Sequence, residues 1–313
     1  MEKFFCTGYK KYLKAPEDFQ VEEVIDPKFT RKFITKGSSI EKMQGKYSLC
    51  NLKKKGLTTE YVIRMIVQEL GIPKEDVGFA GLKDKNAVTS QYLTIKNVGK
   101  EKIEKVKLEN AKLVFIQQTD KKIVRGDLLC NRFRIRLHEV PDKGRVREQL
   151  AGVREGFPNY FGPQRFGSRQ DNHLVGRLLL QGRFRDAERM AGRMEKERAR
   201  FFVHAYQSWL FNQALEPETK DFTEVRIPGY EFWKPTHPME KRMDSLLEKD
   251  GLKRTDFRID KLRLSSRGAQ RQVFVKPSNF KAKITEPIQL EFALPPGSFA
   301  TALLAELLRN QGK

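Results

Sequence analysis

Two patterns of hydrophobic and polar positions alternate along the first half of the chain. Short stretches of strand character cover residues 19–25, 47–52, 91–95 and 111–116. Residues 58–70 instead repeat their apolar side chains with the 3.6-residue period of a helix that lies on a sheet. Thr58 or Thr59 can cap the start of this helix, and Gly71 ends it. Residues 100–107 are rich in lysine and predict a second helix.

Residues 131–138 follow a strict alternation that predicts another strand. Phe133, Ile135 and Leu137 share one face of it, and the three arginines 132, 134 and 136 share the other. The apolar face suits a sheet that covers a core. The arginine face can meet phosphate or water, and water is the commoner partner of such a face.

The pattern changes near Pro141, which indicates a second domain. Residues 150–255 are richer in helix, glycine and arginine, and strand character returns at residues 271–276 and 288–294. After Pro295 the chain ends in a helix pattern with Ser298 as the expected N-cap. We therefore predict an α+β protein in which residues 1–150 and 258–313 form one discontinuous sheet domain and residues 151–257 form an inserted domain.

The charge of the chain favours a polyanionic partner. Its 313 residues include 61 Lys+Arg against 40 Asp+Glu, a formal net charge of +21. Nucleic acid is the first candidate and an acidic membrane surface the second. A basic surface that serves only solubility is the alternative.

Several classes of protein lack support in the sequence. No run of about 18 apolar residues predicts a membrane span, and the N-terminus does not resemble a secretory signal. The three cysteines (Cys6, Cys50 and Cys130) and four histidines have no spacing typical of a metal site or a disulfide framework. Nucleotide-binding, zinc-protease and serine-hydrolase motifs do not occur. We expect a soluble, cytoplasmic, metal-free protein.

One acidic residue stands out in the stretch VGFAGLKDKNAVTSQYLTI, residues 77–95. Asp84 lies between Lys83 and Lys85, just after a Gly-Leu step. Neighbouring cations favour the ionised form of a carboxylate, which can act as a nucleophile or a general base. On residue types alone, an aspartate in a glycine-containing loop is more often a turn or cap residue.

The motifs of the chain, taken together, resemble the TruD family of tRNA pseudouridine synthases. GLKDKNAVTSQ at residues 81–91 is similar to the family signature. Five further stretches match the family in order, namely DFQVE (18–22), NRF (131–133), PNYFGPQRFG (158–167), YQSWLFN (206–212) and LPPGSFAT (294–301). Each one alone is a weak signal, but the set covers almost the whole chain and is highly specific.

The resemblance implies a fold and a reaction. The fold would be a pseudouridine-synthase-like mixed, largely antiparallel sheet with helices, plus a smaller inserted α/β TruD-type domain. The reaction would be isomerisation of uridine to pseudouridine in tRNA, at position thirteen, without cofactor or metal. The segment between the PNYFGPQRFG motif and the returning strand is short for this family, which bears on substrate choice more than on catalysis.

The resemblance also implies roles for individual residues. Asp84 would be the catalytic carboxylate, either attacking C1′ of the ribose or taking the C2′ proton. The supporting residues would be Lys83 and Glu22 at the carboxylate, Asn131, Phe133 and Phe299 around the base, and Gln164 and Arg165 on the RNA. Strand geometry supports one pair independently, because Asn131 and Phe133 are two residues apart and leave the strand on the same face.

A non-catalytic protein that binds or folds RNA through the same basic surface is the alternative function. Binding alone needs no carboxylate among phosphates, so the Lys83-Asp84 pair favours the enzyme. The sequence leaves the oligomeric state open, with a monomer favoured.

Overall fold

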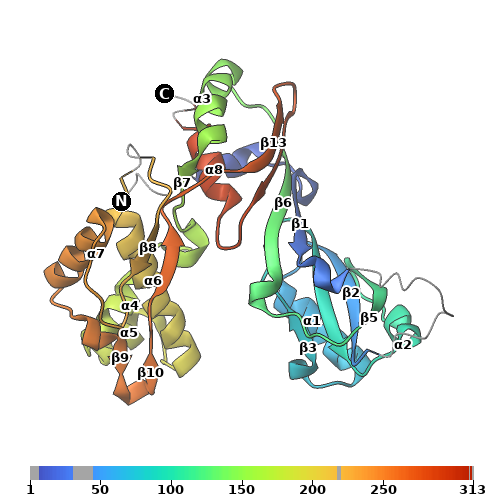
Figure 1. The fold of residues 1–313 in the computed structure, drawn as a ribbon, viewed down its shortest axis with the longest axis horizontal. Helices are drawn as coiled ribbons and strands as arrows, with labels where there is room; N and C mark the ends of the chain where they lie inside the picture. The colour runs from blue at the N-terminus through green and yellow to red at the C-terminus, as the bar shows by residue number, and fades with distance from the viewer. Residues whose placement is uncertain (1–6, 31–44, 217–219, 310, 312–313) are drawn as a thin grey trace. The chain divides into compact units, whose positions relative to one another are not determined.

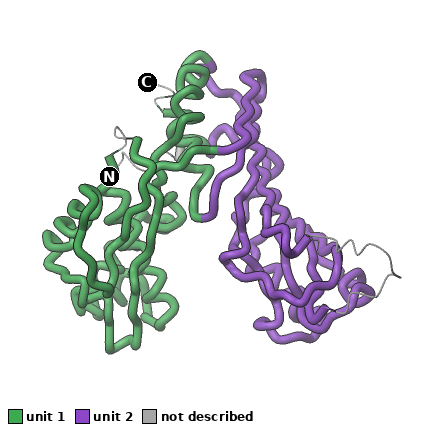
Figure 2. The backbone as a smooth tube through the Cα atoms, viewed as in Figure 1, with its two compact units in different colours: residues 1–9, 144–277, 297–313 green, residues 10–143, 278–296 purple. Residues whose placement is uncertain are grey.

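The protein divides into two compact units. The computed structural model describes residues 7–30, 45–216, 220–309 and 311, so Cys6 lies outside the described residues. Figure 2 colours the two units. The sheet unit comprises Lys10–Lys143 and Ser278–Pro296, and the helical unit comprises Met1–Tyr9, Gly144–Pro277 and Gly297–Lys313.

An eight-stranded sheet forms the frame of the sheet unit (Figure 1). Its order is β13-β14-β6-β1-β4-β2-β5, with β3 beside β4, and every pair is antiparallel except β1 with β4. The strands are β1 (Phe19–Ile25), β2 (Tyr47–Lys55), β3 (Val77–Phe79), β4 (Val88–Lys96), β5 (Ala111–Thr119), β6 (Leu128–Leu137), β13 (Ser278–Lys283) and β14 (Ile288–Leu294). The predicted α+β class with a mixed, largely antiparallel sheet is confirmed.

Helix α1 (Thr59–Leu70) covers part of one sheet face and has the predicted ends. The Thr58 side chain accepts a hydrogen bond from the Tyr61 N–H, and Gly71 ends the helix in the left-handed conformation, with φ of 63°. The apolar side of α1 packs on β2 and β4, where Val62 and Ile66 join Leu52 and Leu93 in a fully buried cluster. The second predicted helix is α2 (Lys100–Lys105).

Strand β6 shows the predicted alternation. Phe133, Ile135 and Leu137 are buried and the arginines between them are exposed. Phe133 lies opposite Val21 of β1 on one side and Phe292 of β14 on the other. The apolar face of β6 is therefore continuous with that of its neighbours.

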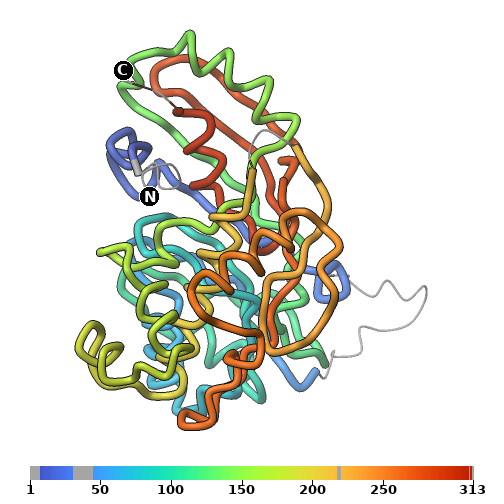
Figure 3. Tube along the Cα trace, turned by 90° about the vertical axis from the view of Figure 1, so that its left-hand side faces the viewer, coloured from blue at the N-terminus to red at the C-terminus, as the bar shows by residue number. Residues whose placement is uncertain are grey.

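The helical unit is built around α6 (Lys196–Ala214), the longest helix in the described part of the chain. Helices α4 (Asn172–Leu180) and α7 (Pro238–Lys249) pack on it, and so do strands β8 (Glu224–Ile227) and β10 (Leu264–Ser265). In Figure 3 this unit contains the yellow and orange parts of the trace. The remaining elements are α3 (Lys143–Glu155), β7 (Phe157–Pro158), α5 (Phe184–Ala191), β9 (Arg258–Ile259), β11 (Ala269–Gln272), β12 (Phe274–Val275) and α8 (Ala300–Leu307).

The boundaries of the two units differ from the predicted domain boundaries. Residues 258–277 belong to the helical unit, because β11 pairs with β8 and β12 pairs with β7. The C-terminal helix α8 belongs there too, since it contacts β7. Ser298 was wrongly predicted to cap α8, because the N-cap position is Phe299. The assignment of a catalytic and an inserted domain stays a prediction.

None of the helices in the described ranges combines the length and the apolar character that a membrane span requires.

Gly78 in β3 offers a test of the packing at this edge of the sheet. A Cβ atom at this position would overlap the Thr94 side chain and lie 2.7 Å from the carbonyl oxygen of Ile123. Because Thr94 Oγ1 also accepts a hydrogen bond from the Ile123 N–H, neither group can move freely. We expect Gly78→Ala to lower the free energy of unfolding by about 2 kcal/mol in urea denaturation.

Gly99→Ala is the matched control. Gly99 has a φ of −79°, and a Cβ there meets nothing within 4 Å. Equal effects of the two substitutions would contradict the described packing of β3.

Candidate active site

The loop between β3 and β4, residues 80–87, carries Lys83 and Asp84 and has no regular secondary structure. Its backbone is tied to the elements beside it. Thr59 Oγ1, at the start of α1, accepts a hydrogen bond from the Lys83 N–H at 3.0 Å and donates one to Gln91 Oε1 at 2.8 Å. Gln91, in β4, in turn donates to the carbonyl oxygen of Gly81 at 3.4 Å. The loop is thus joined to both a helix and a strand.

A buried lysine from β2 also binds the backbone of this loop. Lys54 is only 2% exposed, and its Nζ donates to the carbonyl oxygens of Leu57 at 2.7 Å and Asp84 at 2.9 Å. Burial lowers the pKa of Lys54 to about 8, although the negative charge of Asp84 opposes this shift. These contacts hold the main chain of Asp84 against the sheet.

A buried ion pair fixes the side chain that precedes Asp84. Lys83 Nζ contacts Glu23 Oε1, and the two side chains are 7% and 0% exposed. The other carboxylate oxygen of Glu23 accepts a hydrogen bond from the Tyr92 N–H at 3.0 Å. Burial raises the pKa of Glu23, while the charge of Lys83 acts in the opposite direction. Lys83 is therefore oriented by β1 and is engaged with a carboxylate.

Asn131 and Phe133 lie on the sheet face to which this ion pair belongs. In the antiparallel pair of β1 and β6, Glu23 is opposite Asn131 and Val21 is opposite Phe133. Residues directly opposite one another share a face, so Glu23, Asn131 and Phe133 point to the same side of the sheet. The structure thus brings Lys83, Asn131 and Phe133 to one face, with Asp84 adjacent to Lys83 in the chain.

The two β6 residues differ in their surroundings. Phe133 is 7% exposed and belongs to a row of aromatic rings, stacked on Phe292 at 5.3 Å and edge-on to Phe19 at 6.1 Å. The Oδ1 atom of Asn131 is buried and accepts no hydrogen bond from any described residue. A buried acceptor without a donor is costly unless a ligand supplies one.

Glu22, the predicted supporting carboxylate, points to the opposite face of β1. It is exposed, lies opposite Arg132, and lines an open depression of about 640 Å³ together with Arg134 and Lys53. Its neighbour Glu23 makes the contact with Lys83. The side-chain period of β1 could have shown that Glu23 faces the core, because Glu23 falls in register with the apolar Phe19, Val21 and Ile25.

Phe299 and Arg165 meet in the helical unit, around a buried arginine that the sequence interpretation missed. Arg271 is 8% exposed, and its guanidinium donates to the carbonyl oxygens of Asn159 at 2.6 and 3.0 Å and of Gly297 at 2.7 Å. It lies 3.8 Å from the centre of the Phe161 ring and 5.7 Å from that of Phe299. Burial lowers the pKa of Arg271 to about 9, and the charge of Arg165 adds to this shift.

This arginine joins two of the motifs that were matched in the sequence. Asn159 and Phe161 belong to residues 158–167, and Gly297 and Phe299 belong to residues 294–301. Arg165 also stacks on Phe161, at 5.6 Å. Gln164 is exposed in the short helix Pro163–Phe166.

The described residues contain no group of three His, Cys, Asp or Glu side chains that could hold a metal ion.

A comparison with protein families decides the relationship of the chain. The model of the family described as tRNA pseudouridine synthase D (TruD) matches residues 6–197 and 217–307. This chain belongs to the TruD family.

Individual TruD relatives cover most of the chain. A tRNA pseudouridine synthase D of Thermus thermophilus is 31% identical over 338 residues, which span 94% of this chain and 87% of the relative. A probable tRNA pseudouridine synthase D of Thermococcus sibiricus is 26% identical over an alignment of 413 residues. This alignment spans 96% of this chain and 95% of the relative. The match to the Thermococcus gammatolerans relative is 43% identical but spans only 50% of this chain and 40% of that protein.

The fold agrees with that of a solved TruD structure. The crystal structure of a putative tRNA pseudouridine synthase D from Methanosarcina mazei superposes with a TM-score of 0.65 and covers 95% of this chain and 92% of that one. The sequence identity is 23%, so this likeness concerns the fold alone.

The buried pair of this TruD protein predicts a pH-dependent stability defect. In Lys83→Met, Glu23 loses its cation, and its pKa rises further above the unfolded value. Ionised Glu23 then opposes folding, and this cost appears as pH rises through the raised pKa and is absent below the unfolded pKa. We expect a loss of about 3 kcal/mol at about pH 8 that shrinks at about pH 5, measured by urea denaturation.

The double variant Lys83→Met with Glu23→Gln is the control, because it has no carboxyl group at position 23 to titrate. Relative to the wild type, the double variant should lose less unfolding free energy at about pH 8 than the single variant. Its loss should be similar at about pH 8 and about pH 5. A loss for the single variant that is independent of pH would contradict the buried ion pair.

Proposed function

We propose that this chain is an isomerase that converts uridine to pseudouridine in tRNA, at position thirteen, with Asp84 as the essential carboxylate. The observation that carries the proposal is the buried set of contacts that holds the Asp84 loop. Lys54, Thr59 and the Glu23–Lys83 pair fix it on the sheet face that presents Asn131 and Phe133. Membership of the TruD family and relatives named tRNA pseudouridine synthase D support the reaction and the substrate.

The reaction breaks the bond between C1′ of the ribose and N1 of uracil, and the base leaves with the bonding electrons. The base turns and rejoins C1′ through C5, C5 then loses its proton, and N1 takes up a proton, so the product is an isomer of the substrate. Asp84 serves this sequence as a nucleophile, whose bond to C1′ breaks when C5 attacks, or as the base that takes the C2′ proton and returns it to C2′ when the base rejoins the sugar. No electrons enter or leave overall, so the isomerisation needs no redox partner.

Lys83 acts in this scheme through charge and position. Its ammonium group is paired with Glu23, which orients it within the buried part of the sheet. Because Lys83 directly precedes Asp84 in the chain, this pair also ties the backbone position of Asp84 to β1. We assign to Glu23 the supporting role that the resemblance implied for Glu22, because Glu23 is the carboxylate that contacts Lys83.

Asn131 and Phe133 are suited to hold the uracil. The unused Oδ1 acceptor of Asn131 fits the N–H of a uracil edge, and the amide nitrogen can donate to a uracil oxygen. Phe292 covers one face of the Phe133 ring, so the base is expected at the remaining surface of that ring. Arg165 and Gln164, with Phe299, would contact the RNA from the helical unit.

Phosphate contacts must offset the cost of extracting the base. Flipping a nucleotide out of folded RNA costs a few kcal/mol. The formal charge of +21 supplies cations for the phosphates, and their counterion release makes binding weaken as salt rises.

The test is release of tritium from C5-labelled uridine in an unmodified tRNA transcript. The wild type should release tritium from a transcript with uridine at position thirteen and none when cytidine replaces it. Asp84→Asn should lower the rate by about a thousandfold while tRNA binding is kept, because it removes only the ionised carboxylate. Asp76→Asn, in the short helix Lys74–Asp76, is a control outside the network.

The outcomes separate the parts of the proposal. If the wild type releases nothing from a range of tRNAs, the reaction is wrong and a binding protein remains. If Asp84→Asn turns over like the wild type, the reaction stands and the site is wrong. Release from the cytidine transcript at an unchanged rate would refute position thirteen alone.

A further inference from the structure

The loop between β8 and α7 of the helical unit exposes an unusual side chain. We call residues 229–234, Gly-Tyr-Glu-Phe-Trp-Lys, the aromatic loop. Phe232 within it is 91% exposed, and the other exposed large hydrophobic residues among those described range from 39% to 56%. A phenylalanine at this exposure contributes almost nothing to the core of the protein.

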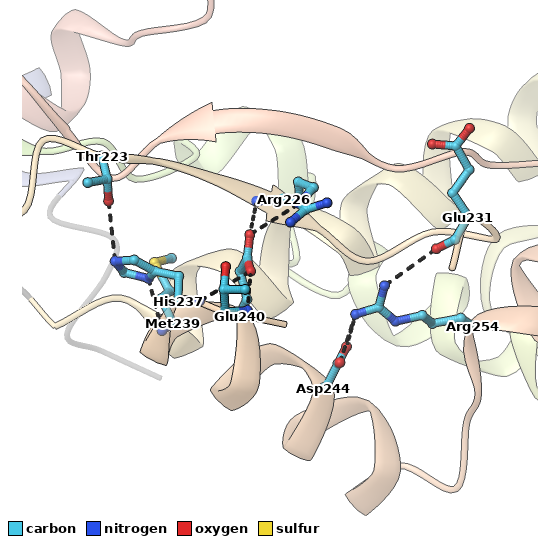
Figure 4. Close-up of polar contacts among 9 residues, drawn as sticks. Thr223, Arg226, Glu231, His237, Met239, Glu240, Asp244 and Arg254 are labelled. Carbon is cyan, nitrogen blue, oxygen red and sulfur yellow. Dashed lines mark hydrogen bonds and ion pairs between the residues drawn. The ribbon is translucent and has the colours of Figure 1, made fainter. Parts of the chain in front are cut away.

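The aromatic loop is nevertheless firmly held at its base. The guanidinium of Arg254 lies 3.6 Å from the centre of the Trp233 ring, and that of Arg226 lies 4.7 Å from it. Arg254 donates to both carboxylate oxygens of Asp244, at 2.7 and 2.8 Å, and to the carbonyl oxygen of Glu231. Figure 4 shows Arg254 reaching Asp244 of α7 on one side and Glu231 on the other.

Two further contacts fix the start of the loop. The Tyr230 N–H donates to the carbonyl oxygen of Ser266 at 2.9 Å. A Cβ atom at Gly229 would overlap the backbone of Arg267 and Gly268, so the two chain segments run in close contact here. Phe232 therefore stands on a braced support, and its exposure is a property of the folded unit.

The start of α7, next to this loop, is fixed by its own capping contacts. His237 Nδ1 accepts a hydrogen bond from the Met239 N–H, and Glu240 accepts from the N–H groups of Arg226 and Thr236 (Figure 4). His237 Nε2 faces both Thr223 and Asp221, at 3.2 and 2.6 Å. The Thr223 hydroxyl donates its hydrogen to Asp221 and therefore not to His237. His237 is thus a structural cap of α7 and does not activate the Thr223 hydroxyl as a nucleophile.

Two arginines line a pocket that includes Tyr230 of the aromatic loop. The guanidinium of Arg258 lies 4.5 Å from the centre of the Tyr230 ring. Arg258 and Arg263 line a pocket of about 300 Å³ together with Tyr230, Ser265, Leu264 and the acidic Asp260. Residues 252–276, which supply these arginines, carry eight basic and two acidic side chains.

An exposed ring beside guanidinium groups is the combination that binds unpaired nucleotides. Every base has a face that can stack on an aromatic side chain, and the guanidinium groups bind the phosphates. We propose that the aromatic loop binds an unpaired segment of the RNA substrate, with Phe232 stacked on a base and Arg258 and Arg263 on phosphate. The identity of the partner as RNA rests on the proposed function, whereas the site shares no residue with those assigned to the reaction.

The experiment compares binding of an unmodified tRNA transcript with binding of a fully paired RNA duplex of similar length. Phe232→Ala should weaken binding of the tRNA about tenfold and leave binding of the duplex unchanged, because only unpaired bases can stack. Phe232→Trp should restore tRNA binding. Phe201→Ala is the control, since Phe201 is 42% exposed on α6 of the same unit.

A second variant tests the phosphate contacts. Arg258→Gln with Arg263→Gln should reduce the slope of log affinity against log salt by about two, since two phosphate contacts are lost.

The free energy of unfolding in urea should be unchanged for Phe232→Ala, because the Phe232 side chain is almost fully exposed.

The results distinguish this inference from the proposed function. Wild-type tRNA affinity in Phe232→Ala would overturn the inference even if the wild type releases tritium. Weakened tRNA binding in a protein that releases no tritium would support the inference and refute the reaction. If tRNA binding is unchanged and sedimentation shows that Phe232→Ala disrupts self-association, the aromatic loop is a protein interface and the inference is wrong.

Discussion

The hydrogen bonds from a buried lysine to main-chain oxygens support the whole candidate site. The loop of residues 80–87 has no regular structure, so its carbonyl groups need donors from elsewhere in the fold. Lys54 supplies one at Asp84 and also donates to the carbonyl oxygen of Leu57, outside the loop. It remains buried, and burial lowers its pKa to about 8. In the proposed reaction the Asp84 carboxylate must meet one atom of a ribose, and such a support matters there because small displacements are costly in catalysis.

The elements around this loop could be predicted because local pattern and packing agree in them. Strand β1 has its predicted bounds, and α1 begins and ends at its predicted caps. The alternation of β6 also correctly places Phe133 on the core side. In each case the side-chain period decides which face is buried.

Other features depend on contacts between distant parts of the chain and could not be predicted. The role of Arg271 arises only when residues 159 and 297 meet around it. The unit boundaries follow strand pairings such as β11 with β8, which no local pattern reveals. The orientation of Glu23 could have been predicted, because the side-chain period of β1 groups it with the apolar Phe19, Val21 and Ile25. The resemblance to the family instead pointed to the neighbouring Glu22. The exposure of Phe232 required the structure, since an apolar residue in a sequence is ordinarily expected in the core.

The central claim is that Lys54 holds Asp84 in its reactive position. The most direct measurement is the single-turnover rate of tritium release from C5-labelled tRNA by Lys54→Met at saturating enzyme. The loss of the contacts to Leu57 and Asp84 should slow this rate by about a hundredfold, whereas Lys53→Met, an exposed neighbour in the same strand, should react like the wild type. A Lys54→Met enzyme that reacts as fast as the wild type would contradict the account.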